Sequence, residues 1–446
     1  MSSFEYSGRT AGAGVRRTRW VTAGVALLAA TSLWGTGVAV ASAEGGAGRA
    51  GPASASHRAR AQLPRPTGPY AVGTTALHLV DPGRKDPWRP ERTRELMVSL
   101  WYPASRGPGG EGRAPYMERR AATHFGTERG MANRNYQVPP GSTDWSATRT
   151  HAREHAPVAR GGPRPVVLYS AGLGDPRTWN TGLVEELASH GYIVGTVDHT
   201  YEASEVQFPG ERVAESVFPD LAERPDRDIS RLLRTSMRAR VDDTRFVLDQ
   251  LGALRAGRGT QAHSLPRGLA EALDLRRVGM VGHSAGGFTA AQTMHDDPRI
   301  KAGINMDGQM DFPTTPDGHG SALSTVARDG LDRPFLLMGS DQGAGDNQAS
   351  WTALEKNSRG WHRQVTLKGG AHGAYTDAAP LLPQLADQGA IPAQVVTDDI
   401  GTVRPDRAVA ATRAYVSSFF DRWLRHHDDH LLDGPSPRFP EMKYAS

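Results

Sequence analysis

The sequence predicts an α/β fold, in which a doubly wound, mostly parallel sheet carries helices on both faces. Short apolar runs of strand length recur along the chain, separated by turns or by segments with helical periodicity. Strands that alternate with helices form a parallel sheet, because each helix returns the chain across one face of that sheet. Six runs carry this pattern: residues 165–169, 192–197, 277–281, 302–306, 334–338 and 364–367.

The remaining elements fit a single domain, which we expect to span residues 68–432. Two further apolar runs precede the six and should form an antiparallel pair of strands, at 73–80 and 95–102. Residues 103–163 follow the second strand and show no periodicity, which predicts an irregular surface insertion of the kind that covers active sites. Helical patterns occupy three segments: 179–190, 229–254 and 407–424. We expect residues 433–446 to form a C-terminal tail.

The first 43 residues predict an export signal and therefore a secreted, extracellular protein. Three arginines within residues 16–19 form a basic start, residues 21–40 carry no charge, and small residues at 41–43 fit a cleavage site. An uncleaved membrane anchor is the alternative, because an uncharged stretch of this length could just span a bilayer. The paired arginines leave Sec and Tat export both open. Residues 44–67 have few large apolar side chains and predict a disordered spacer.

Charge and cysteine content restrict the partners of the chain. It carries 52 Lys+Arg and 48 Asp+Glu, but the first 43 residues hold four arginines and one glutamate, which leaves 48 against 47. The arginines are scattered and no basic-aromatic motif is present, so no nucleic-acid partner is expected. The chain has no cysteine, so an exported domain must be held together by its core without disulfides. The sequence contains no feature that indicates an oligomeric state.

A serine stands where a strand turns into a helix. Residues 282–286 read Gly-His-Ser-Ala-Gly and lie between the apolar run at 277–281 and a helical pattern. Glycines two residues before and after Ser284 permit a bend too tight for a Cβ, which raises the hydroxyl above the sheet edge. This is the layout of a nucleophile elbow, the signature of serine hydrolases with an α/β-hydrolase fold.

A serine hydroxyl needs an imidazole to take its proton and a carboxylate to orient that imidazole. His372 lies in a loop of small residues after the last predicted strand, where this architecture presents its histidine. Two carboxylates end neighbouring strands at the same rim of the sheet, Asp307 and Asp341. Physical reasoning alone leaves both open as the acid, because either loop could deliver a carboxylate to the imidazole.

From residue 70 to 425 the chain resembles the platelet-activating-factor acetylhydrolase family, the secreted and type II branch of the α/β-hydrolases. Besides the elbow, three segments carry the resemblance: 98–104, 168–174 and 191–199. In that family the acid follows the strand after the nucleophile helix, and residues 303–307 match this pattern 23 residues beyond Ser284. The resemblance therefore implies Asp307 as the acid.

The same resemblance assigns the oxyanion hole. It implies that the backbone amides of Leu173 and Ala285 stabilise the tetrahedral intermediate, in agreement with the general layout of the fold. The chain departs from the family at Ala171, where a histidine is usual, and in the insertion after Pro103. These departures concern the substrate more than the catalytic residues.

Two other classes of protein compete with a serine hydrolase. His151, Glu154 and His155 match the inverted zinc-protease pattern HxxEH, although Pro157 would shorten the helix that this motif requires. A non-catalytic binding module on a hydrolase fold is the other alternative, because fold does not fix function.

Two further polar groups could also be read as sites. Residues 426–430 could bind an adventitious metal, but a charged, exposed end of the last helix is the expected explanation. Asp198 and His199, at a strand end, are expected to be structural.

Together these observations predict a secreted serine esterase or lipase that needs no cofactor or metal. Its substrate is expected to be a small-molecule or lipid ester with a short or modified acyl chain, and a lipid substrate would require transient contact with a lipid surface.

Overall fold

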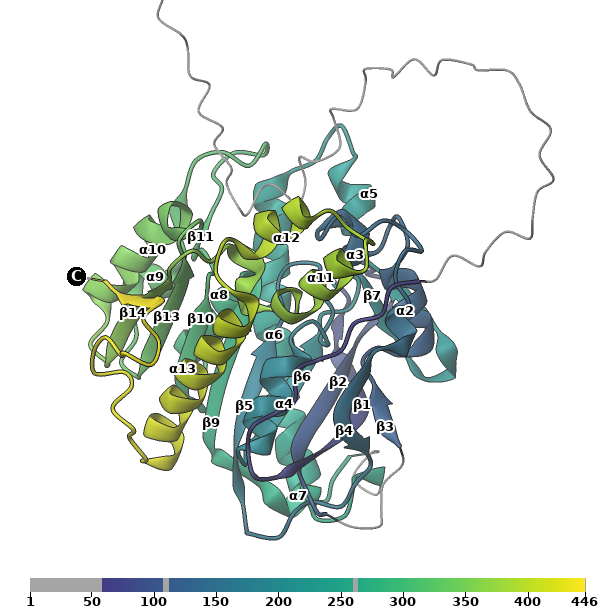
Figure 1. Ribbon diagram of the computed structural model, residues 1–446, viewed down its shortest axis with the longest axis vertical. Coiled ribbons are helices and arrows are strands. Elements are labelled where there is room, and N and C mark those ends of the chain that lie inside the picture. The colour runs from purple at the N-terminus through teal and green to yellow at the C-terminus, as the bar shows by residue number, and fades with distance from the viewer. Residues whose placement is uncertain (1–57, 107–111, 260–263, 446) are drawn as a thin grey trace, which may run out of the picture.

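The computed structural model describes residues 58–106, 112–259 and 264–445 (Figure 1). Its centre is an eleven-stranded sheet with the order β15-β14-β13-β10-β9-β5-β6-β2-β1-β4-β3. In chain order these strands are β1 (Ala71–Lys85), β2 (Thr93–Ala104), β3 (Arg113–Pro115), β4 (Arg149–Glu154), β5 (Arg164–Ser170), β6 (Ile193–Asp198), β9 (Leu273–His283), β10 (Ile300–Met306), β13 (Phe335–Ser340), β14 (His362–Leu367) and β15 (Met442–Tyr444). Two small hairpins are also present: β7 (Glu205–Gln207) with β8 (Val213–Glu215), and β11 (Asp311–Phe312) with β12 (Ala322–Leu323).

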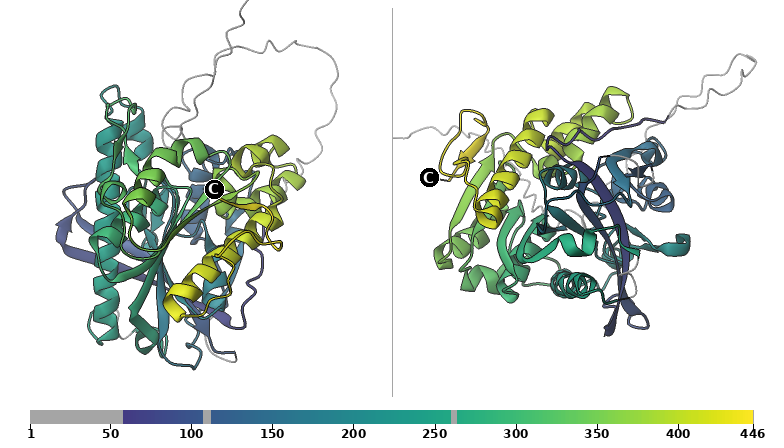
Figure 2. Two further views of the ribbon diagram at one scale, coloured as in Figure 1. Left: turned by 90° about the vertical axis from the view of Figure 1, so that its left-hand side faces the viewer. Right: turned by 90° about the horizontal axis from the view of Figure 1, so that it is seen from below.

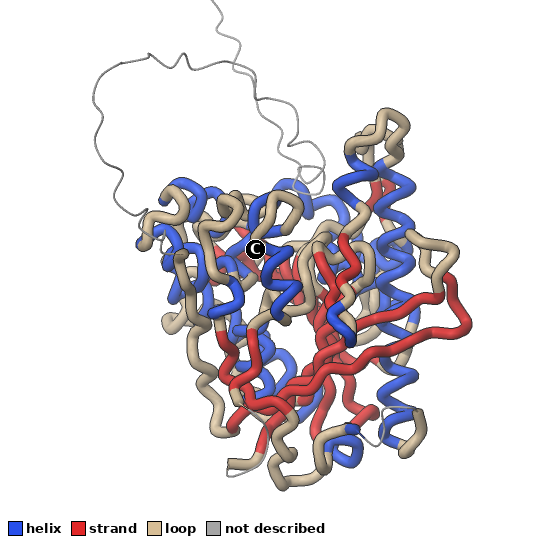
Figure 3. The backbone as a smooth tube through the Cα atoms, turned by 90° about the vertical axis from the view of Figure 1, so that its right-hand side faces the viewer, coloured by secondary structure: helices blue, strands red, loops and turns tan. Residues whose placement is uncertain are grey.

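The six central strands, from β14 to β6, run parallel, as the alternating pattern predicts. Every residue of β5 and β6 is buried, because helices cover both faces of the sheet. This burial explains why the strands read as continuous apolar runs instead of alternating ones. The first two strands form the expected antiparallel pair, and β2 joins the parallel core by pairing antiparallel with β6. Figure 3 views the sheet from the side of β1 and β3.

The helices form a layer on each face of the sheet, which confirms the predicted α/β-hydrolase fold (Figure 2). Their bounds are α2 (Arg119–Phe125), α3 (Met131–Arg134), α4 (Thr181–Ser189), α5 (Phe218–Ala222), α6 (Ile229–Arg255), α7 (Leu269–Ala272), α8 (Ala285–Asp296), α9 (Thr325–Asp329), α10 (Ala344–Asn357), α11 (Ala378–Asp387), α12 (Ala393–Ile400) and α13 (Pro405–Arg425). One layer contains α4 and α13, whose Phe419 and Phe420 are fully buried. The other contains α6 and α8, with Leu251 and Phe288 in the core.

The insertion at 103–163 is more regular than its composition predicts. It contains β3, α2, α3 and β4, and β4 extends the large sheet by pairing with β1. Its aromatic residues pack on the body of the domain: the Phe125 ring lies 5.0 Å from that of Trp145 and 5.1 Å from that of Trp179 (centroid distances). The prediction of an irregular segment is therefore wrong here, because large side chains scattered among Gly, Arg and Pro still bury a shared core.

Both ends of the described chain also pack more tightly than expected. Within the predicted spacer, residues 58–67 lie against the domain: Ala59 and Leu63 are buried, and the Arg60 amide donates to Gln388 Oε1 at 3.0 Å. Within the predicted tail, β15 pairs antiparallel with β14 and buries Met442. Residues 1–57, with the predicted signal, lie outside the described residues. None of the described helices is both long and apolar enough to cross a bilayer.

Gly279, in the central strand β9, tests how closely α13 packs on the sheet. A Cβ at this position would lie 2.5 Å from a ring carbon of Phe420, so Gly279→Ala forces the ring to shift. Overpacking of this kind should destabilise the protein by about 1–3 kcal/mol. The urea unfolding midpoint of the variant, compared with that of the native chain, measures this destabilisation. The control Gly345→Ala adds the same methyl in open space on α10 and should be neutral or stabilise by up to about 1 kcal/mol. Equal midpoints for the two variants would contradict this packing.

Candidate active site

Ser284 occupies a strained corner between β9 and α8. Its backbone has φ 56° and ψ −123°, and its amide donates to the Met306 carbonyl at 2.8 Å. The two motif glycines make the corner sterically feasible. A Cβ at Gly282 would lie 2.2 Å from the backbone of Gly286, and a Cβ at Gly286 would lie 1.9 Å from the Ser170 carbonyl oxygen. The predicted strand-to-helix elbow is therefore the local geometry of this segment.

Asp307 and His372 are joined by a hydrogen bond. Asp307 directly follows β10, and its Oδ2 lies 2.8 Å from His372 Nδ1. The carboxylate is buried and also accepts from the Ser340 amide (2.9 Å), the Ser340 hydroxyl (2.8 Å) and Asn347 Nδ2 (3.1 Å). Burial alone raises the pKa of Asp307, but His372 and the Ser340 donors outweigh it and hold that pKa below its usual value. Asp307 is thus an ionised carboxylate that fixes the imidazole.

His283, the residue before Ser284, links the elbow to the histidine loop. Its ring lies 4.4 Å from the His372 ring (centroid distance), and its Nε2 lies 2.8 Å from the His372 carbonyl oxygen. Burial and the neighbouring His372 lower the pKa of His283 to about 3, so its ring is neutral and its Nε2–H donates to that carbonyl. Sequence reasoning missed this residue, because the second position of the motif accepts many residue types.

The predicted residues therefore converge. The Ser284 amide bonds to the residue before Asp307, and the residue before Ser284 contacts His372. Ser284, Ala285 and His372 are partly exposed, whereas most of β9, α8 and the turn after His372 is buried. A ligand can therefore reach this cluster from the surface.

Asp341, the alternative acid, occupies a different environment. It is exposed, and its Oδ2 accepts a hydrogen bond from the Gly369 amide at 2.5 Å. This hydrogen bond connects the loop after β13 with the loop after β14. The geometry favours Asp307 as the partner of His372, because Asp307 is buried and has the orienting bond to Nδ1.

Two backbone amides in and near the elbow come from different segments and lack an acceptor in the described residues. Leu173 lies in the loop after β5, and no acceptor in the described part of the chain is bonded to its amide. Ala285 is the first residue of α8, where helix geometry provides no acceptor for the amide. The close contact of Gly286 with Ser170 brings the two segments together. The arrangement can therefore offer two free donors to a developing negative charge.

A small apolar pocket borders Leu173. The insertion and neighbouring helices supply its walls, with Met131 from α3, Phe218 and Pro219 from α5, and Leu232 from α6. Sequence analysis could not identify these residues, because they come from three segments with no shared motif. The apolar walls of the pocket suit an apolar group better than a charged one.

The zinc-protease motif does not have the geometry of a metal site. Residues 149–154 form strand β4 and not a helix, and His155 follows the strand in a turn with φ 51°, so His151 and His155 do not share one helical face. The amides of His151 and Ala152 donate to the buried Glu185 of α4, at 2.6 and 2.8 Å. The motif therefore anchors the insertion on the domain, and the metallopeptidase alternative is wrong.

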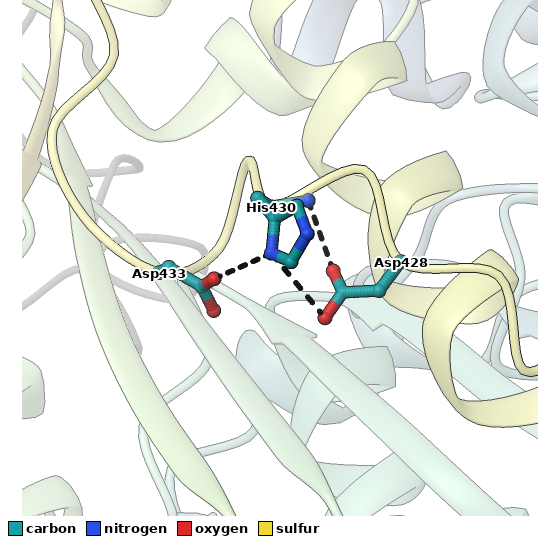
Figure 4. A group of neighbouring side chains, drawn as sticks. All are labelled: Asp428, His430 and Asp433. Carbon is teal, nitrogen blue, oxygen red and sulfur yellow. Dashed lines mark hydrogen bonds and ion pairs between the residues drawn. The ribbon is translucent and has the colours of Figure 1, made fainter.

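The polar residues after α13 form a small cluster (Figure 4). His430 Nδ1 lies 2.9 Å from Asp433 and 3.9 Å from Asp428. Arg422 pairs with both carboxylates, at 3.2 and 2.8 Å. The arrangement is exposed and its charges are balanced within the chain, so it gives no reason to assign a metal. Asp198 pairs with Arg177 in the interior, in agreement with the expected structural role.

Comparisons with known proteins find relatives that cover most of the chain. A solved structure described as a ferulic acid esterase from Streptomyces cinnamoneus superimposes with a TM-score of 0.67 at 35% identity, over 86% of this chain and 99% of that one. The probable 1-alkyl-2-acetylglycerophosphocholine esterase of Arthroderma benhamiae is 26% identical over 86% of this chain and 93% of its own length. The platelet-activating factor acetylhydrolase of Cavia porcellus is 25% identical over 83% and 82%.

The fold and these relatives define an α/β-hydrolase that cleaves carboxylic esters. The model of the family described as platelet-activating factor acetylhydrolase, isoform II, matches residues 55–389, and the chain belongs to this family. The resemblance drawn from the sequence is confirmed. The substrate of this esterase is a small-molecule or lipid ester.

Glu185, the anchor of the insertion, should make stability depend on pH. Burial raises the pKa of its carboxyl to about 8, although the His151 and Ala152 amides oppose the shift. A pKa higher in the folded than in the unfolded chain gives stability that is fully present below about pH 4 and is lost as pH rises through about 8. Glu185→Gln should therefore lose less stability between pH 5 and 8 than the native chain, in urea unfolding. The exposed control Glu91→Gln should follow the native chain. Identical pH dependence for all three proteins would contradict the assignment.

Proposed function

We propose that this chain is an exported serine esterase in which Ser284 is the nucleophile, His372 the general base and acid, and Asp307 the residue that orients His372. The hydrogen bond between Asp307 Oδ2 and His372 Nδ1, beside a serine on a strained elbow, is the observation that carries the proposal. Export rests on the character of residues 1–43, which have a basic start, an uncharged stretch and small residues at the cleavage position.

The reaction would proceed through an acyl-enzyme. Ser284 Oγ attacks the ester carbonyl carbon while His372 Nε2 takes its proton, and the imidazolium is stabilised by Asp307. Collapse of the tetrahedral intermediate breaks the bond to the alcohol, which leaves with the proton from His372. A water molecule, deprotonated by His372, then attacks the acyl-enzyme, and collapse of the second tetrahedral intermediate releases the acid while His372 returns the proton to Ser284 Oγ.

The amides of Leu173 and Ala285 would bind the oxyanion of both tetrahedral intermediates. Each donor of this kind contributes about 3 kcal/mol to the transition state, because it is already oriented when the charge develops. No step of this sequence requires a metal or organic cofactor, since the side chains supply the nucleophile, the proton transfers and the charge stabilisation.

We propose esters of compact acyl groups as the substrates. The apolar pocket beside Leu173 has little free volume and is lined in part by the insertion, so it suits a short or modified acyl group better than a long chain. One relative is named for an acetylated glycerophosphocholine and the solved neighbour for ferulic acid. Both names are compatible with such a pocket.

Ser284→Ala should abolish hydrolysis of a short-chain nitrophenyl ester, with kcat falling about 10⁴-fold or more, because no other nucleophile is activated. A fluorophosphonate probe should label the native chain and not the variant, and a chelator should leave native activity unchanged. Retained activity or labelling in the folded variant would overturn the nucleophile assignment. An unlabelled, inactive native chain would instead favour a binding module.

A matched pair of variants shows which of the two candidate carboxylates, Asp307 or Asp341, is the catalytic acid. Asp307→Asn should reduce kcat by about 10³–10⁴-fold, because His372 loses the carboxylate that fixes its tautomer and stabilises its charge. Asp341→Asn changes an exposed residue that bonds only to a loop amide among the contacts described above, so its kcat should stay within about twofold. Steady-state kinetics with thermal melting of both variants measures this. The reverse pattern would transfer the role of acid to Asp341.

A further inference from the structure

A buried arginine supports the loop that carries Leu173. Arg240 of α6 has 1% of its surface exposed and lies against the end of β5. Its Nη1 donates to the Ala171 carbonyl at 2.7 Å and to the Ser170 hydroxyl at 3.2 Å, and its Nη2 donates to the Gly172 carbonyl at 2.9 Å. Two successive carbonyls of the loop are thus turned toward one rigid guanidinium fork.

The guanidinium is itself held in place. Glu202, which is fully buried, forms an ion pair with Arg240, and its second oxygen accepts a hydrogen bond from the Ser236 hydroxyl. A buried ion pair with additional hydrogen bonds holds a side chain in one orientation. Any other orientation would separate the two charges and leave each of them buried without a partner, which is strongly destabilising. Arg240 therefore cannot relax without disturbing the loop carbonyls.

A second chain of hydrogen bonds fixes Ser170. Its hydroxyl lies 3.0 Å from His199 Nε2, and His199 Nδ1 lies 2.9 Å from Asp243, which in turn pairs with Arg94. The order hydroxyl, imidazole, carboxylate is that of a catalytic triad, but Ser170, His199 and Asp243 are all buried. Substrate cannot reach this serine, so the group acts as a support for the end of β5.

The orientation of the Leu173 amide follows from peptide geometry. The carbonyl of Gly172 and the amide of Leu173 belong to one planar, trans peptide unit and point in opposite directions. Because Arg240 binds that carbonyl on one side of the loop, the amide is directed to the other side, away from the guanidinium. This accounts for an amide that is bonded to no acceptor in the described part of the chain.

We propose that Arg240 is a positioning residue for ester hydrolysis, which orients the Leu173 amide toward the oxyanion by binding the carbonyls of Ala171 and Gly172. The inference rests on the proposed function, since it needs Leu173 to be an oxyanion donor. Arg240 does not touch the substrate. Its loss should therefore weaken binding of the transition state and leave ground-state binding unchanged, which lowers kcat and not KM.

The test compares Arg240→Lys with Arg413→Lys in the full chain. Lysine keeps the charge but loses the fork that binds two carbonyls at once. Arg413 is an internal control, because it is also buried, pairs with Glu186 and donates to the carbonyls of Pro64, Arg65 and Gly182, none of which belongs to the loop that carries Leu173. Measurements are kcat and KM for a nitrophenyl ester, Ki for an alkyl trifluoromethyl ketone, which forms an oxyanion on the serine, and Ki for the unreactive alcohol of the same shape.

Arg240→Lys should lower kcat at least tenfold, with KM within twofold of the native value. The Ki of the trifluoromethyl ketone should rise by a similar factor, whereas the Ki of the alcohol should stay unchanged. Arg413→Lys should lose comparable thermal stability without these changes. If Arg240→Lys does not fold, Glu202→Gln, which releases the guanidinium, should show the same pattern to a smaller degree. An unchanged ketone Ki in a folded variant would overturn the proposal. Failure of the proposed function would appear separately, as a native chain that neither reacts with the ketone nor depends on Ser284.

Discussion

The close contact between the elbow and the end of β5 is the constraint on which the site depends. A Cβ at Gly286 would lie 1.9 Å from the carbonyl oxygen of Ser170, so only glycine allows α8 to start where it does. This approach places the first turn of α8 beside the loop that carries Leu173. It also forces Ser284 into a positive φ, a strained conformation that the surrounding sheet stabilises.

Buried charge on both sides of the elbow makes the site rigid. Asp307 is surrounded by donors from Ser340, Asn347 and His372, and Arg240 is paired with Glu202 beneath the loop after β5. Each buried charge carries a desolvation cost that is offset only when all of its hydrogen bonds form together. The polar groups near the site therefore favour one arrangement of the loops over other compact arrangements.

Sequence reasoning succeeded where a local signal existed and failed where contacts are long-range. All eight predicted strands are present, because each contains a short apolar run that can be recognised without knowledge of its neighbours. The order of residues 58–67 and of the C-terminal strand β15 was missed, because both are stabilised by contact with distant segments and not by their own composition. The supporting roles of His283 and Arg240 had no local signal for the same reason.

The sequence by itself determined the α/β-hydrolase class, the serine elbow and the position of His372 after the last central strand. These features follow from short-range rules: strand length, glycine spacing and the alternation of strands and helices. Only the tertiary structure decided which carboxylate bonds His372, why the HxxEH segment is a strand, and how the insertion contributes to the apolar pocket. Each depends on distances between segments far apart in the chain, which are set when the sheet is assembled and its two helical layers pack against it.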